Sequence, residues 1–157
     1  MRITKGLIIG TIFGFCLSFC ISFIFMLLAQ GLAGGVTSLF GESWLYYATI
    51  VPFIFTFAIL GFYFTKRENV SNKKLWLLSL ITALFITLYS GTIGAVTGEY
   101  VVRELIRGEE YHWQMLIEDI FLWGSIYAFI LLPLTTPLAR LIIQVFFDLF
   151  KKCKISI

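Results

Sequence analysis

Hydrophobic residues fill four long stretches of this chain, and polar residues are confined to the short segments between them. The stretches cover about residues 6–29, 44–64, 75–97 and 115–138. An α-helix rises about 1.5 Å per residue, so each stretch is long enough to cross the roughly 30 Å hydrocarbon layer of a bilayer. The pattern predicts an all-α fold, a polytopic membrane protein in which residues 1–157 form a single four-transmembrane-helix bundle.

The composition agrees with lipid as the surrounding medium. Hydrophobic residues make up 59% of the 157 residues and charged residues only 13%, whereas a soluble domain of this size needs more charge on its surface. The net charge of +3 is not gathered on one basic face, so we expect no nucleic-acid partner. The three cysteines are too few and too widely placed to predict a disulfide framework.

Basic residues occur at every second junction between the hydrophobic stretches. If the N-terminus, residues 65–74 and the C-terminal tail lie in the cytoplasm, that side carries 10 of the 12 Lys and Arg residues, and the opposite side carries only Arg103 and Arg107. This is the positive-inside bias of membrane proteins. It predicts a multi-pass protein with both termini cytoplasmic. The short polar tails favour a bacterial inner membrane over a eukaryotic membrane.

The first stretch follows two basic residues, Arg2 and Lys5, as the core of a secretory signal does. Its apolar run is much longer than the roughly 7–15 residues of such a core. We therefore expect this segment to be retained as a membrane helix.

The same stretch carries small residues at every fourth position, which places them on one face of a helix. They are Gly6, Gly10, Gly14, Ser18 and Ser22. Lipid tails give apolar helices no hydrophobic reason to associate, so close backbone approach over small residues supplies the packing instead. The pattern predicts a helix-packing face. Packing against another helix of the same chain is the favoured interpretation, and self-association or a partner subunit is the alternative.

A second small-residue stripe lies near the outer end of the third stretch. Ser90, Gly94 and Gly98 repeat at the same four-residue spacing. The glycines of the first stretch lie near its inner end, so the two stripes do not superpose as an internal repeat. We expect two separate close helix crossings within one bundle, either of which is a candidate partner face.

The segment 99–113 is the largest polar element outside the spans. Glu99 and Arg103 are four residues apart, and Glu104 and Arg107 are three apart, which are the spacings of ion pairs on a helix surface. The segment predicts a short outer amphipathic helix that ends at Gly108. With the residues that follow, it forms an outer polar cap consisting of Glu99, Arg103, Glu104, Arg107, Glu109, Glu110, His112, Glu118 and Asp119.

The outer cap contains the only histidine, His112, among several carboxylates. Such groups bind divalent cations, but their spacing matches no ligand motif, so a solvated loop is favoured and no metal site is predicted. Glu118 and Asp119 lie where the fourth span begins, and negative charge suits a helix N-terminus. A site for a cation or a basic partner is the alternative for this pair.

After the fourth span the polar residues again recur every four positions. They are Arg140, Gln144, Asp148 and Lys152, separated by apolar residues. One straight helix over 115–150 would be about 54 Å long, too long for a bilayer. We therefore predict a span ending near Pro133 and Pro137, followed by a C-terminal interfacial helix at about 139–152.

No catalytic signature is present. The chain has one histidine, no serine or cysteine with a recognisable base, and no phosphate-binding glycine loop. We expect no cofactor and no enzymatic activity.

The expected function is that of a non-enzymatic integral membrane protein that packs its helices against another membrane component, as accessory, assembly and immunity-type subunits do. Besides membrane lipids, its expected partner is another membrane protein or a second copy of the chain. The alternative is an oligomeric channel or small-solute transporter, because glycine faces and hydroxyl groups can line a pore. No span carries a central carboxylate, which ion-coupled carriers usually need.

Overall fold

The computed structural model describes residues 2–32, 43–67, 69–108 and 113–152, and every regular element in them is helical. Four of its helical segments are long and apolar enough to cross a membrane. The predicted all-α, four-helix membrane fold is therefore confirmed. The elements in chain order are α1 (Arg2–Leu32), α2 (Trp44–Thr65), α3 (Asn72–Gly91), α4 (Ile93–Tyr100), the π-helix η1 (Val101–Ile106) and α5 (Trp113–Lys152).

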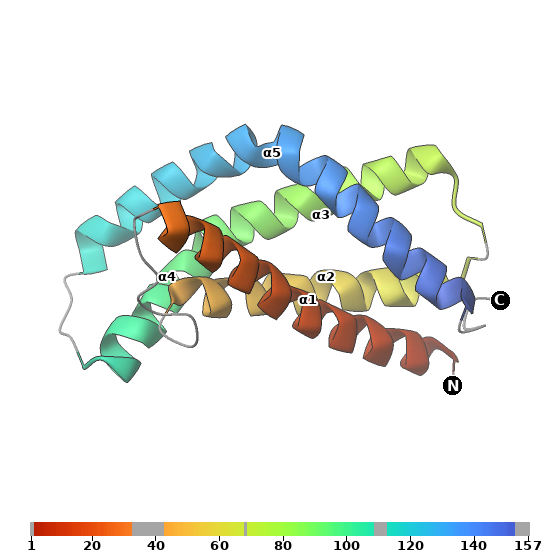
Figure 1. Ribbon diagram of the computed structural model, residues 1–157, viewed down its shortest axis with the longest axis horizontal. Coiled ribbons are helices and arrows are strands. Elements are labelled where there is room, and N and C mark those ends of the chain that lie inside the picture. Colours follow the sequence, from red (N-terminus) through yellow and green to blue (C-terminus); the bar gives the residue numbers. More distant parts are fainter. Residues whose placement is uncertain (1, 33–42, 68, 109–112, 153–157) are drawn as a thin grey trace.

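The bundle consists of two helix pairs (Figure 1). α1 packs along α2, and α3 packs along α5. Successive spans run in opposite directions, so the start of α1 and the end of α5 lie at one end of the bundle, which we call the terminal end. The starts of α2 and α5, together with α4, lie at the opposite end.

Small residues allow α1 and α2 to meet backbone to backbone. Gly10 faces the carbonyl oxygen of Phe57, and Gly61 faces that of Gly6. A Cβ atom at Gly10 or Gly61 would overlap these oxygens, which are held in place by their own helices. This crossing therefore requires glycine, in keeping with the small-residue packing of membrane helices.

Hydroxyl groups continue the crossing where the glycines end. Oγ of Ser22 lies 2.8 Å from Oγ1 of Thr49, which makes a buried hydrogen bond between α1 and α2. Ser18 is also buried, and its hydroxyl donates to the carbonyl oxygen of Phe15 at 2.8 Å. A hydrogen bond between membrane helices stabilises their packing by roughly 0.6–2 kcal/mol.

Aromatic rings fill the terminal end of the bundle. The ring of Phe146 on α5 lies 5.2 Å from that of Phe57 and 4.6 Å from that of Phe13, between ring centroids. Phe64 packs 4.9 Å from Phe147 in the same way. Each such pair contributes about 0.5–1.5 kcal/mol beyond the burial of its surface. This cluster is where α1, α2 and α5 come together.

The third span is broken at Thr92, within the range 75–97 that the sequence predicts as one helix. Thr92 has φ −116° and ψ −94°, and its hydroxyl donates to the carbonyl oxygen of Leu88 at 2.6 Å. Gly91 and Gly94 flank the break, and glycine weakens a helix by about 1 kcal/mol relative to alanine. The break redirects the chain, because α3 packs on α5 whereas α4 packs on α2.

α4 approaches α2 at a carbonyl group that a proline leaves without its helical partner. Pro52 lies inside α2 and has no N–H to donate to Ala48. Gly94 lies against this carbonyl, since an added Cβ would be only 2.6 Å from the oxygen of Ala48. Gly98 meets the backbone of Trp44 similarly. Both glycines of the second stripe are therefore buried against α2.

The predicted outer helix at 99–113 begins earlier than expected. α4 starts at Ile93 and continues into η1, which ends at Ile106. Glu99 thus lies inside a helix, because the helix restarts directly after the break at Thr92. Gly108 has a positive φ of 67°, a conformation that suits glycine, and it follows the end of η1 as the sequence predicts.

The structure corrects the predicted division of residues 115–152 into a span at 115–138 and a separate helix at 139–152. α5 is one helix with Pro133 and Pro137 inside it, and Figure 1 shows that it bends rather than ends. In lipid, the backbone groups around a proline have no better partners than those of the continuing helix. The apolar face beyond the prolines packs into the core through Ile143, Phe146, Phe147 and Phe150.

A row of polar side chains links α5 to the start of α3. Arg140 donates through Nη2 to Oδ1 of Asn72 at 2.9 Å and through Nη1 to Oε1 of Gln144, also at 2.9 Å. Nε2 of Gln144 donates in turn to Oδ1 of Asp148 at 3.0 Å. The four-residue recurrence in the sequence therefore forms a hydrogen-bonded row that fastens the terminal end of α3 to α5.

Candidate functional site: an apolar cavity between the helix pairs

The two helix pairs diverge beyond the aromatic cluster and leave a cavity of about 520 Å³ between them. All four spans and α4 contribute to its wall. Trp44 and Phe53 line it from α2, Ile86 from α3, and Trp123 and Leu131 from α5. Its volume lies within the roughly 300–1,000 Å³ of typical ligand sites.

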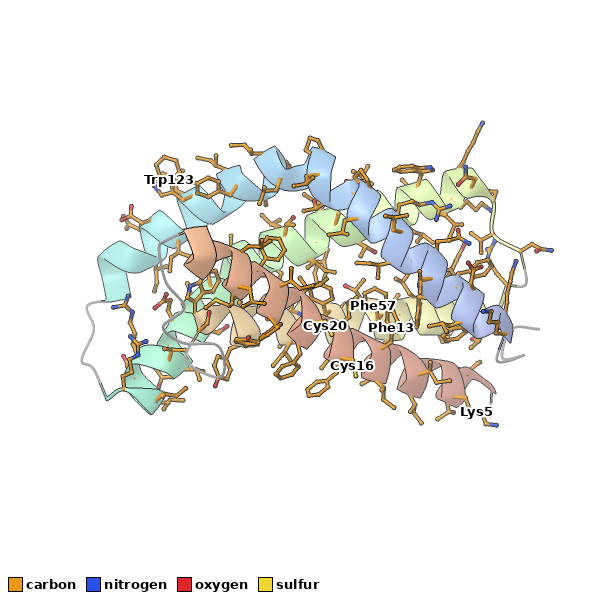
Figure 2. All side chains as sticks on the ribbon, in the orientation of Figure 1. Lys5, Phe13, Cys16, Cys20, Phe57 and Trp123 are labelled. Atoms are coloured by element: carbon orange, nitrogen blue, oxygen red, sulfur yellow. The ribbon has the colours of Figure 1, made fainter. Side chains whose placement is uncertain are left out.

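Aromatic rings close the cavity toward the terminal end. Phe13 and Phe57 lie side by side there, with ring centroids 5.0 Å apart (Figure 2). Within the described ranges, no Cα atom of α1 lies within 8 Å of a Cα atom of α5. Trp123, 52% exposed, projects from α5 at the other end of the cavity, with its ring 5.9 Å from that of Tyr127. The lining side chains that remain exposed come from two helices, and they are Phe25 from α1 and Trp123, Tyr127, Leu131 and Leu138 from α5. The cavity therefore opens sideways between α1 and α5.

The wall is apolar apart from a few hydroxyl groups, and none of its described residues is charged. Three of these hydroxyls already donate to backbone carbonyls: Thr49 to Leu45 at 3.1 Å, Thr87 to Ala83 at 2.8 Å, and Thr135 to Leu131 at 3.0 Å. Oγ of Ser90 is buried and has no hydrogen-bond partner among the described residues. The wall thus suits a hydrocarbon surface and offers little to an ion or a strongly polar solute.

An empty cavity of this size would be costly. The free-energy penalty of an apolar void is about 24 cal/mol per Å³, so each part of the cavity that stayed empty would lower stability in proportion to its volume. We therefore expect the cavity to be filled, and its wall requires an apolar occupant.

The stripe of small residues on α1 is not part of this cavity and is not available to a partner. All five of its members are buried, and they face α2 of the same chain. In this arrangement the stripe packs against another helix of the same chain, which is the interpretation that the sequence favours over self-association or a partner subunit. In the second stripe, Gly94 and Gly98 are buried against α2, and only Ser90 reaches the cavity wall.

The outer polar cap is only partly assembled in the described structure. Nε of Arg103 donates to Oε2 of Glu99 at 2.6 Å, which is the ion pair that their spacing predicts. Glu118 and Asp119 are exposed near the start of α5. Glu104 and Arg107 lie in and directly after η1, whereas the remaining cap residues, Glu109, Glu110 and His112, lie outside the described residues.

Sequence reasoning missed three glycines that hold the cavity walls in position. Gly61 completes the α1–α2 crossing, and Gly91 meets Gly124 where α3 crosses α5. An added Cβ at Gly91 would lie 3.1 Å from the carbonyl oxygen of Gly124. None of the three belongs to a four-residue repeat of glycine and serine: Gly61 and Gly124 are isolated glycines, and Gly91 lies next to Ser90, outside the spacing of Ser90, Gly94 and Gly98. The pairing of Gly91 with Gly124 depends on which helices are neighbours.

No protein-family model, curated protein sequence or solved structure matches this chain.

Proposed function

We propose that this protein is a non-enzymatic integral membrane protein that acts by binding another membrane component, and that this component enters the cavity between the helix pairs. The observation that carries the proposal is an uncharged cavity of about 520 Å³ that opens sideways in the plane of the spans. Largely apolar cavities with a few polar groups are typical binding sites.

The burial of the small-residue stripes changes which surface we assign to the partner. The glycine faces that the sequence offers as candidate partner faces are occupied by α2. The cavity is a better candidate, because its wall is built from all the spans and remains uncovered on one side. Binding there would fill the space between the α1–α2 and α3–α5 pairs and hold the pairs in a fixed relation.

The cavity does not favour the alternative of a channel within one chain. An ion entering it would lose its hydration shell and meet only a few hydroxyl groups, three of which already donate to backbone carbonyls. Solute flux through liposomes containing the purified protein would support the channel alternative, provided that filling the cavity abolished it.

We also assign both termini to the cytoplasm and the protein to a bacterial inner membrane. The basic residues at the ends of α2 and α5 and at the start of α3 gather at the terminal end, whereas Arg103 and Arg107 lie near the opposite end. The positive-inside rule supports this orientation.

Replacing Thr135 with phenylalanine should displace the bound component. Thr135 lines the cavity, so a bulky ring there would occupy its volume. We expect the amount of bound component to fall about tenfold or more, since about 1.4 kcal/mol of lost binding free energy corresponds to a tenfold change. Native mass spectrometry of protein released directly from its membranes would identify the component and measure its occupancy.

The matched control is Leu134→Phe. Leu134 is the neighbouring residue on α5, but its side chain is 71% exposed and does not line the cavity. This variant should retain the component at the wild-type level. Equal occupancy in both variants, or no bound component in the wild-type protein, would contradict the proposed function.

A further inference from the structure

We infer that the occupant of the cavity is one acyl chain of a membrane phospholipid, which enters from the bilayer through the opening between α1 and α5. This inference rests on the proposed function and names the chemical class of its ligand. Three features of the cavity carry it: its narrow shape, its uncharged wall and the direction in which it opens.

The cavity is long and narrow. Its lining residues extend from Trp44 to Phe57 on α2 and from Ile120 to Ile142 on α5, which corresponds to a length of about 20–33 Å. Spread over this length, the 520 Å³ that the centre of a water molecule can reach gives a passage of about 2.5 Å radius, or about 4 Å once the roughly 1.4 Å radius of water is added. The passage is thus about 8 Å across, whereas a helix with its side chains is about 10–12 Å across. The cavity therefore fits a single extended hydrocarbon chain and not a partner's transmembrane helix.

The wall matches a hydrocarbon chain in polarity as well. Phe53, Ile86 and Leu131 present apolar surface from three different helices. No described lining residue carries a charge that would pair with a phosphate, so the headgroup has no favourable position inside. The chain would lie in the cavity, and the headgroup would remain at the membrane surface.

The opening lies where a lipid can use it. The exposed lining side chains come from α1 and α5, so the cavity opens on a side of the bundle where these apolar spans would face hydrocarbon. Trp123 and Tyr127 stand at this part of α5 with exposed rings, and both also line the cavity. Figure 2 shows the Trp123 ring projecting from α5. These two rings would lie between the acyl chain in the cavity and the bulk lipid outside.

Fluorescence quenching by brominated lipids tests this inference, because bromine on an acyl chain quenches a tryptophan that it contacts. In a chain whose four native tryptophans are replaced by phenylalanine, Phe53→Trp reports on the cavity: Phe53 lines the wall and is only 5% exposed. Phe55→Trp faces bulk lipid, as Phe55 is 57% exposed. Phe64→Trp lies in the core, where Phe64 is fully buried and outside the cavity.

The three proteins are placed in vesicles of phosphatidylcholine and phosphatidylglycerol that carry bromine at several positions along the acyl chains. We expect the Phe53→Trp reporter to lose its emission to nearly the same extent as the Phe55→Trp reporter, and the Phe64→Trp reporter to keep its emission. Adding Thr135→Phe should protect the cavity reporter, and adding Leu134→Phe should not.

If bromine quenched the Phe53→Trp reporter as little as the Phe64→Trp reporter, the inference would be overturned. If a protein partner nevertheless copurified and was lost in Thr135→Phe, the inference of an acyl chain would be wrong. The proposed function would still stand. If nothing was bound and Thr135→Phe changed nothing, the proposed function itself would fail. Each reporter must first show the thermal stability of the parent chain, which confirms that its cavity is intact.

Discussion

A Gly10→Leu variant should fail to fold into the native bundle. Gly10 faces the carbonyl oxygen of Phe57, and even a Cβ atom would overlap this oxygen. Since the obstacle is backbone, no side-chain rotation relieves it, and α1 must move away from α2. We expect a loss of about 3 kcal/mol or more in the free energy of unfolding. Thermal unfolding in mild detergent, with the fraction of monodisperse protein, measures this effect.

Gly31→Leu is the control for this substitution. Gly31 also lies in α1, but no atom lies within 4 Å of the position that its Cβ would take. This variant should unfold near the wild-type temperature. If Gly10→Leu were equally stable, α1 would not cross α2 as described, and the interpretation of the stripe as a contact between different chains would regain support.

A Gly124→Leu variant should separate the other helix pair. The added side chain would overlap the carbonyl oxygen of Gly91, where α3 and α5 cross. A loss of stability comparable with that of Gly10→Leu is expected, again about 3 kcal/mol or more. Because Gly91 and Gly124 both line the cavity, the Gly124→Leu variant should also lose the bound component. Unfolding temperature and native mass spectrometry on the same preparation test both consequences.

Phe129→Leu provides the comparison on α5. Phe129 is 62% exposed and faces away from the helix pairs, so leucine there should change neither stability nor binding appreciably. Wild-type stability of Gly124→Leu would show that the close approach of α3 to α5 does not occur. The cavity as described would then lose one of its walls.

The sequence was sufficient to predict the spans because hydrophobic length depends on the bilayer rather than on the fold. The predicted stretch at 44–64 differs from α2 by a single residue. The four-residue spacing of Gly6, Gly10 and Gly14 likewise predicted a packing face, since that spacing alone places small residues on one side of a helix.

The break at Thr92 and the continuity of α5 were not predicted, for related physical reasons. Prolines often end helices in water, but Pro133 and Pro137 only bend α5, because lipid offers the neighbouring backbone groups no alternative partners. At Thr92 the break is stabilised by contacts of α3 with α5 and of α4 with α2. Such contacts depend on which helices are neighbours.

The cavity could not be predicted from the sequence at all. Its lining residues come from all parts of the chain, from Ile21 to Ile142, and share no spacing. They form a cavity only because close crossings at Gly10 and Gly124 draw the helices into two pairs. The aromatic cluster around Phe146 then closes the space at one end.

An experimental structure of the wild-type protein in lipid nanodiscs would show directly whether a hydrocarbon chain occupies the cavity. The account predicts a continuous tube of density between the α1–α2 and α3–α5 pairs, in contact with Phe53 and Thr135 and reaching the lipid between α1 and α5. A bundle in which α5 closes against α1 along its whole length, leaving no space between the pairs, would contradict it.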